Sequence, residues 1–300
     1  MHTKSVRSQK QPAKNMKYKM FLTSGGVSAF LGAAVSTYAQ PASINGSYDP
    51  AFGSALSVQT VGTDYGTATA ASGGNQLDAG YGLIASGNLY LFFAGNTSDG
   101  NSLQVYLSTG QAGGESTFNV SGGSYTSTGT QNMDGSVFSP GFSATEALDV
   151  NTYAGTIYAN IFNLVAGTGG YAGSTADAGG TISGVYNVTL AVNESSAAGV
   201  GSNTGAGALG VTTGWEFAIP LSALNNSSSI EVLADIGSDG GSGSLSNQFL
   251  APNNVSGYPS TFNFGSTPGV YFTVAVPEPS SMVLFGLSGL TGLLAIRRRK

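Results

Sequence analysis

The chain of 300 residues has 46 glycines, ten Lys and Arg, 15 Asp and Glu, a single His and no Cys. All ten cations lie within residues 4–19 and 297–300, and the His is His2, so residues 20–296 contain no Lys, Arg, His or Cys. This excludes from the body a Ser–His or Cys–His nucleophile pair, a Schiff-base lysine, a His/Cys zinc site and a nucleic-acid interface. Carboxylate chemistry, binding of hard cations or sugars, and structural roles remain.

The N-terminus has the three parts of an export signal. Residues 1–19 are basic, residues 20–35 are apolar, and the small residues Thr37 and Ala39 occupy the -3 and -1 positions of a cleavage site. We therefore expect a signal peptide over residues 1–39 that is cleaved after Ala39. Met16 is an alternative start, and an uncleaved membrane anchor is the alternative interpretation.

Short alternating apolar runs follow, separated by Gly, Ser and Asn clusters, which is typical of antiparallel β-structure. Strands are expected at residues 88–94, 103–108, 156–162, 185–192, 215–219, 229–236 and 270–276, with a single helical turn at 221–224. The turn-rich residues 95–102 predict a hairpin between the first two strands. The pattern predicts an all-β domain over residues 40–276, an antiparallel, jelly-roll-like β-sandwich.

The C-terminus has three unlike elements in a fixed order. The triplet Pro277-Glu278-Pro279 precedes an apolar run over residues 281–296, and the chain ends with Arg297, Arg298, Arg299 and Lys300. Sixteen helical residues span about 24 Å, slightly less than the ~30 Å hydrocarbon core of a bilayer. We expect a transmembrane helix with a basic stop-transfer tail that stays in the cytoplasm, so that residues 277–300 form a separate region.

This order of elements resembles the PEP-CTERM sorting signal of Gram-negative bacteria. The resemblance implies that Pro277, Glu278 and Pro279 are recognised by a membrane-embedded exosortase. It also implies a transient stay in the inner membrane, removal of the tail, and delivery to the cell surface or an extracellular matrix, often together with exopolysaccharide. An ordinary tail anchor is the alternative, although such an anchor does not require a Pro-Glu-Pro triplet.

Four short sequence segments of the body resemble segments of secreted β-sandwich proteins of environmental bacteria. They are residues 77–82, 88–96, 214–221 and 246–250. The third segment also resembles the late strand of family-9-like carbohydrate-binding sandwiches. The resemblance implies a fold and an extracellular setting, and it brings no catalytic residue with it.

Three tyrosines are candidates for contact with glycan. Tyr90, Tyr106 and Tyr158 alternate with the apolar positions of their strands, and an exposed row of tyrosines can stack on sugar rings. Burial of these strands on both faces is the alternative. Trp215 shares a face with Phe217 and is expected in the core.

Two further functions depend on carboxylates. Residues 99–102 and 239–242 combine Asp and Gly in loops that offer oxygen ligands for Ca²⁺, but neither has the spacing of an EF-hand loop. Glycoside hydrolysis needs only two carboxylates, about 5 to 9.5 Å apart, and Glu216 and Glu231 lie on strands facing away from the core. We expect a non-enzymatic exported protein without a cofactor or metal site; a carboxylate-dependent glycan hydrolase and a Ca²⁺-dependent adhesin are the alternatives.

Overall fold

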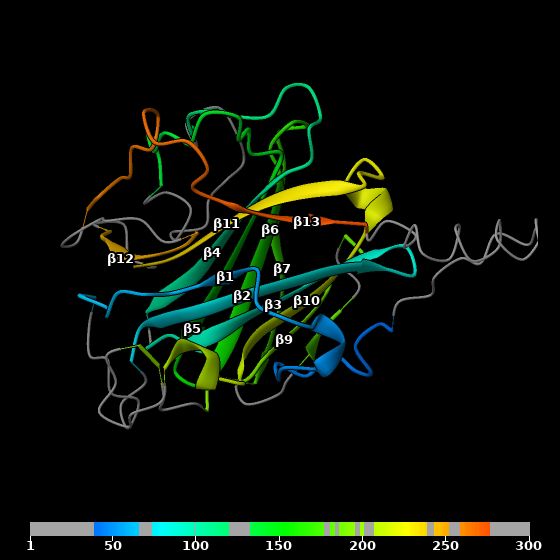
Figure 1. Cartoon of the computed structure of the whole chain (residues 1–300), viewed down its shortest axis with the longest axis vertical. Coiled ribbons are helices and arrows are strands. Elements are labelled where there is room, and N and C mark those ends of the chain that lie inside the picture. The colour runs from blue at the N-terminus through cyan, green and yellow to red at the C-terminus, as the bar shows by residue number, and fades with distance from the viewer. Residues whose placement is uncertain are drawn as a thin grey trace, which may run out of the picture. The chain divides into compact units, whose positions relative to one another are not determined.

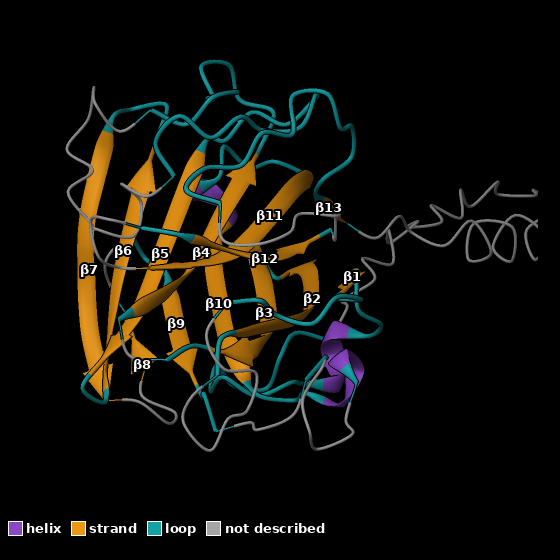
Figure 2. Ribbon diagram, turned by 90° about the vertical axis from the view of Figure 1, so that its left-hand side faces the viewer, coloured by secondary structure: helices purple, strands orange, loops and turns teal. Residues whose placement is uncertain are grey.

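The computed structural model describes two antiparallel sheets that face each other (Figures 1 and 2). The described residues are 39–65, 74–98, 100–119, 133–176, 181–183, 186–195, 199–200, 207–238, 243–251 and 259–276. The chain divides into the units Met1–Val35 and Ser36–Lys300, and every described residue belongs to the second. The antiparallel β-sandwich is confirmed. The predicted signal helix and C-terminal transmembrane helix lie outside the described residues.

Each sheet combines strands from both halves of the chain. The first sheet has the order β1 (Ser57–Val58), β2 (Gln76–Ala85), β3 (Asn88–Asn96), β10 (Gly214–Pro220), β9 (Thr189–Val192) and β8 (Thr181–Ile182). The second has the order β12 (Leu245–Leu250), β11 (Ser229–Ser238), β4 (Asn101–Ser108), β5 (Glu146–Tyr153), β6 (Thr156–Asn163) and β7 (Thr168–Ala176), and β13 (Phe272–Ala275) also pairs with β11. The labelled helical segments are the short 3-10 turns η1 (Pro50–Phe52), η4 (Ala208–Gly210) and η5 (Leu221–Ala223). No helix in the described part of the chain is long and apolar enough to cross a bilayer.

The core between the sheets follows from the period-2 patterns of the sequence. Trp215, Phe217 and Ile219 of β10 are buried in one cluster with the apolar residues of β3, as expected. Leu103, Val105 and Leu107 of β4 supply the facing layer of the same cluster. Pro220 ends its strand, and the helical turn expected after it is present as η5.

The expected hairpin between residues 88–94 and 103–108 is wrong. β3 pairs with β2 and β10, whereas β4 pairs with β5 and β11 in the other sheet. Both strands turn an apolar face inward, so the connection crosses from one sheet to the other. The hairpin that does form joins β2 to β3 through Ser86 and Gly87, whose φ values of 48° and 79° suit a two-residue turn.

The expected strand over residues 185–192 is confirmed only in its second half. Tyr186 and Asn187 have φ values of 50° and 55°, which is left-handed backbone, so β9 begins only at Thr189. Tyr186 is 42% exposed, whereas Val188 is buried.

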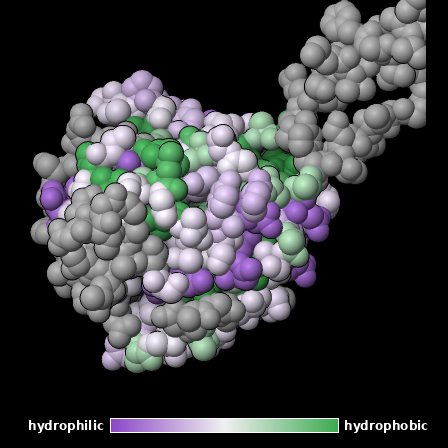
Figure 3. Space-filling model, turned by 60° about the horizontal axis from the view of Figure 1, so that its bottom comes forward, coloured by the Kyte–Doolittle hydropathy of each residue, from purple (hydrophilic) through white to green (hydrophobic). Residues whose placement is uncertain are grey.

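Both sheets are also covered on much of their outer faces. An aromatic cluster on the first sheet contains Phe52, Tyr81, Tyr90 and Phe92. On the second sheet, Phe118 and Phe138 pack on Tyr106, and Phe249, Phe262 and Phe264 belong to the same cluster. The surface in Figure 3 mixes small apolar areas with hydrophilic side chains.

Two amide side chains of β12 bond to the first sheet and to the segment between β1 and β2. On β12, the Gln248 Oε1 atom accepts a 2.9 Å hydrogen bond from the Leu77 amide of β2, and its Nε2 atom donates to the Val61 carbonyl at 2.8 Å. The neighbouring Asn247 Oδ1 atom accepts from the Asp64 amide at 2.7 Å. We call Asn247 and Gln248 the amide clasp. The segment 246–250 therefore has a structural role, because its amide clasp holds β12 against the first sheet and the segment before β2.

The contact between β3 and β10 requires glycine at position 214. A Cβ atom there would lie 1.9 Å from the Phe93 carbonyl oxygen, which real structures do not tolerate. We expect Gly214→Ala to lower the free energy of unfolding by at least about 1–3 kcal/mol, as overpacking does. Gly207→Ala is the matched control, because its Cβ meets no atom within 4 Å. Urea denaturation measures both, and equal midpoints for the two variants would contradict the prediction.

Candidate functional site

The sorting triplet begins directly after the last residue that pairs with the β-sandwich. The body ends on β13, and the Val276 amide still donates a 2.9 Å hydrogen bond to the Ser228 carbonyl. The next residue is Pro277, and the sorting triplet Pro277-Glu278-Pro279 and the basic tail 297–300 lie outside the described residues. Ala39, the expected cleavage position, is the first described residue and is exposed.

The expected row of exposed tyrosines is wrong for two of its three members. Tyr106 is 1% exposed and packs edge-on against Phe118, with ring centroids 5.2 Å apart. Tyr90 is 6% exposed, and its hydroxyl group donates a long 3.4 Å bond to Gln40. Both strands are covered on their outer faces by other segments, so a sugar has no access to either ring.

Tyr158 belongs instead to a different tyrosine group, which the structure exposes. It is partly exposed on the outer face of β6, since its neighbours along the strand point into the core. Tyr153 of β5 and Tyr171 of β7 are 62% and 60% exposed. The register places Asn151 opposite Tyr158 and Asn160 opposite Tyr171. We call Tyr153, Tyr158 and Tyr171 the tyrosine face; of the two neighbouring amides, Asn160 is partly exposed and Asn151 is buried.

The two carboxylates considered for hydrolysis do not form a pair. Glu216 lies on β10 of the first sheet and Glu231 on β11 of the second. Glu216 is fully buried, and its Oε2 atom accepts from the amides of Asn45 and Gly46 at 2.8 and 3.1 Å. Burial raises the pKa of Glu216 despite these donors. Glu216 therefore anchors the N-terminal segment onto the sheet.

Two further carboxyl groups are buried in the described part of the chain. Asp78 and Asp235 are fully buried. The Oδ2 atom of each has no hydrogen-bond partner within the described structure. Burial raises the pKa of Asp78 to about 7 and raises that of Asp235 well above its usual value. These groups favour the protonated form at moderately acidic pH.

The calcium candidates fall largely outside the structure. Asp99 and residues 239–242 are not described, whereas residues 100–102 continue into β4. Within the described ranges, no three or more Asp, Glu, His or Cys side chains gather in a way that would hold a metal ion.

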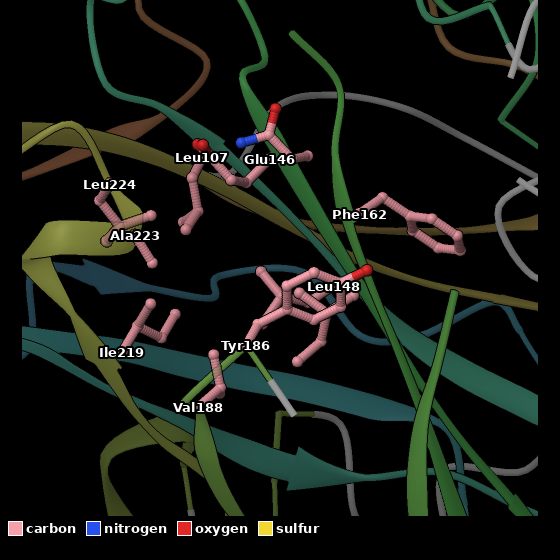
Figure 4. A pocket seen from close by; sticks show the side chains of 11 residues that line it. Leu107, Glu146, Leu148, Phe162, Tyr186, Val188, Ile219, Ala223 and Leu224 are labelled. Atoms are coloured by element: carbon pink, nitrogen blue, oxygen red, sulfur yellow. The ribbon is translucent and has the colours of Figure 1, made fainter. Parts of the chain in front are cut away.

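A small cavity opens between the sheets at one end of the sandwich (Figure 4). Its volume is about 50 Å³. Six aliphatic side chains from β4, β5, β6, β10 and the segments beside them line it: Leu107, Leu148, Ile161, Val188, Ile219 and Leu224. The Phe162 ring at its edge points away from the cavity and belongs to the outer aromatic cluster.

One carboxyl-bearing residue lies in the lining of this apolar cavity. Glu146 lies between Leu107 and Asn163 in register, on the inward face of β5, and is 6% exposed. Its Oε2 atom accepts from the Thr145 hydroxyl, while Oε1 has no hydrogen-bond partner among the described residues. Burial raises the pKa of Glu146 to about 7, with the Thr145 bond acting in the opposite direction. Tyr186 is the other titratable residue of the lining.

Sequence reasoning missed this cavity and two members of the tyrosine face. The Gly-rich sequence of β7 hid Tyr171, and Glu146 has the appearance of an ordinary surface carboxylate. Tyr153 is found only once β5 is known to pair with β6.

Comparison with known proteins identifies the C-terminal segment. Residues 275–300 match the family described as the PEP-CTERM protein-sorting motif, so the match begins at the last residue of β13. The motif implies an exported protein that carries a membrane-anchored sorting signal and is processed by an exosortase. No curated protein and no solved structure matches the chain.

Proposed function

We propose that this chain is a non-enzymatic protein of the cell surface or extracellular matrix of a Gram-negative bacterium. The observation that carries the proposal is the sorting motif over residues 275–300, joined directly to the last strand of the β-sandwich. In this proposal a signal peptide ending at Ala39 starts export, and exosortase releases the body from its C-terminal anchor. The absence of Lys, Arg, His and Cys from residues 20–296 supports a role without catalysis.

The proposal includes association with exopolysaccharide through the tyrosine face. Tyr153 and Tyr171 offer exposed aromatic planes, and the partly exposed Asn160 lies opposite Tyr171 in the register. Aromatic planes pack on the apolar faces of sugars, and amides donate and accept hydrogen bonds with hydroxyl groups.

Processing at both ends is tested by the intact mass of the protein from its host. We expect the released fraction to have lost residues 1–39 and the apolar segment 281–296 with its basic tail. Replacing the Pro277-Glu278-Pro279 triplet by three alanines should leave the tail in place and the protein in the membrane fraction. Glu231→Ala, a carboxylate change within the body, is the control and should be processed normally. Normal processing of the triple-alanine variant would contradict recognition of the triplet.

Glycan binding is tested by pull-down with exopolysaccharide purified from the host. We expect the double variant Tyr153→Ala, Tyr171→Ala to bind at least about tenfold more weakly. The scale is taken from nucleic-acid bases, for which loss of one aromatic stacking partner costs roughly 1–3 kcal/mol. Tyr186→Ala removes an exposed tyrosine elsewhere on the body and is the control. Equal binding by all three proteins would rule out the tyrosine face as the contact surface.

A further inference from the structure

The cavity at Glu146 combines an apolar wall with one incompletely bonded carboxyl group. Glu146 is more than nine-tenths buried, and its Oε1 atom has no hydrogen-bond partner among the described residues. A buried carboxyl group without a complete set of partners is costly, so the site gains if a donor enters it. Residues 20–296 supply no Lys, Arg or His, so a cationic donor has to come from outside the body.

The size of the cavity limits what can enter. A water-sized group needs about 10–15 Å³ of such volume, so a cavity of about 50 Å³ holds roughly three to five non-hydrogen atoms. Aliphatic side chains form most of the wall, which favours methylene groups over hydroxyl groups. A sugar ring is too large and too polar for this space.

No charged side chain among the described residues of the cavity lining acts on Glu146, so a bound ligand can determine whether this carboxyl group is ionised. Leu107 of β4, Ile161 of β6, Ile219 of β10 and Leu224 beside η5 are all uncharged, and Tyr186 is the remaining titratable group of the lining. An ammonium ion favours the ionised carboxylate, and a charge-assisted hydrogen bond is roughly twice as strong as a neutral one.

We propose that this cavity binds a short, unbranched alkylammonium group: the Glu146 side chain turns its Oε1 atom toward the ammonium, which donates to it, and the methylene groups pack against Leu107, Leu148 and Ile219. The ligand is a primary amine of three to five non-hydrogen atoms. This binding site is separate from the tyrosine face and does not depend on the sorting motif.

Binding should follow the ionisation of Glu146. With its pKa at about 7, the carboxylate is about 30-fold less populated at pH 5.5 than at pH 8, whereas an alkylammonium group stays charged at both. We therefore expect n-propylamine to bind about 30-fold more tightly at pH 8. Titration calorimetry of the full chain in a non-ionic detergent, in two buffers of different ionisation enthalpy, should show a proton released on binding near pH 6.5.

Three variants and one neutral ligand make the test specific. Glu146→Gln keeps the shape of the side chain and should abolish binding of n-propylamine. Asp235→Asn changes a buried carboxyl group on the opposite face of the same sheet and should bind like the wild type. Ala223→Leu alters an exposed residue at the edge of the cavity and should block the amine while leaving Glu146 intact. Circular dichroism checks that each variant is folded.

The outcomes separate the amine proposal from its competitors. If n-propanol binds as tightly as n-propylamine, the site recognises neutral donors and the proposal is wrong. Amine binding that survives Glu146→Gln, or that is unchanged by Ala223→Leu, places the amine elsewhere and also overturns it. Should Glu146→Gln not fold, Ala223→Leu and the pH dependence still decide the question.

Discussion

The protein is expected to melt at a higher temperature at pH 4.5 than at pH 8, by on the order of 10 °C. Burial raises the pKa of Asp78 and Glu146 to about 7 and raises that of Asp235 well above its usual value. Each carboxyl group therefore binds its proton more tightly in the folded chain than in the unfolded one. Folding takes up protons between about pH 4 and pH 7, so the free energy of unfolding falls as the pH rises through this window. One pKa unit corresponds to about 1.4 kcal/mol.

At low pH the stability of the fold depends on a carboxyl group whose pKa is lowered by folding. Asp49 accepts hydrogen bonds from the amides of Ala42 and Ala51, which lowers its pKa, so this contribution is lost as the pH falls below its folded pKa. We expect maximal stability near pH 4 to 5. Asp235→Asn and Asp78→Asn should each raise the melting temperature at pH 8 and flatten the pH profile. A melting temperature that falls steadily from pH 8 to pH 4.5 would show that these carboxyl groups are ionised in the folded protein.

Breaking the amide clasp should have the second large effect. Gln248→Leu removes the acceptor of the buried Leu77 amide and the donor to the Val61 carbonyl. A buried polar group left without a partner costs about 1–3 kcal/mol, and the Val61 carbonyl adds a smaller loss because its residue is partly exposed. We expect the midpoint of urea denaturation to shift by the corresponding amount.

The control for the clasp is the same Gln→Leu substitution at a loop position away from the clasp. Gln111→Leu replaces a partly exposed glutamine in a loop and should leave the midpoint within about 0.5 kcal/mol of the wild type. If Gln248→Leu unfolds at the same midpoint as Gln111→Leu, water replaces the two lost hydrogen bonds and the clasp contributes little.

Strands are predicted correctly where apolar and polar residues alternate clearly. They are missed where the segment is extended only because it pairs with a neighbouring strand. β3, β4, β6, β10 and β11 carry alternating apolar residues and were expected within a few residues of their bounds. β7 has a sequence rich in Gly, Ser and Thr, and it is extended because it pairs with β6 along its whole length. No local pattern indicates that β3 pairs with β10 across the middle of the chain, so the hairpin prediction placed β3 beside the wrong strand.

The candidate sites were less predictable than the fold because their burial depends on distant segments. Alternation correctly placed Tyr106 opposite the inner face, but it could not show that loops around Phe118 and Phe138 would cover it. Glu146 is buried by η5 and by the turn at Tyr186, which lie at least 40 residues further along the chain. The C-terminal motif is the opposite case, since its three elements are contiguous and were read directly from the sequence.

The long-range strand pairs also have a consequence for the rate of folding. Trp215 pairs with Phe93 and Leu233 with Tyr106, so the partners lie 122 and 127 residues apart. Pairings between such distant segments fold in milliseconds to seconds or more slowly, because a large loop must close before they gain contacts. Until β10 and β11 have crossed the membrane, the edges of β3 and β4 are open to strands of other chains. Retention on the membrane until the last strands have paired would therefore limit association between incompletely folded copies.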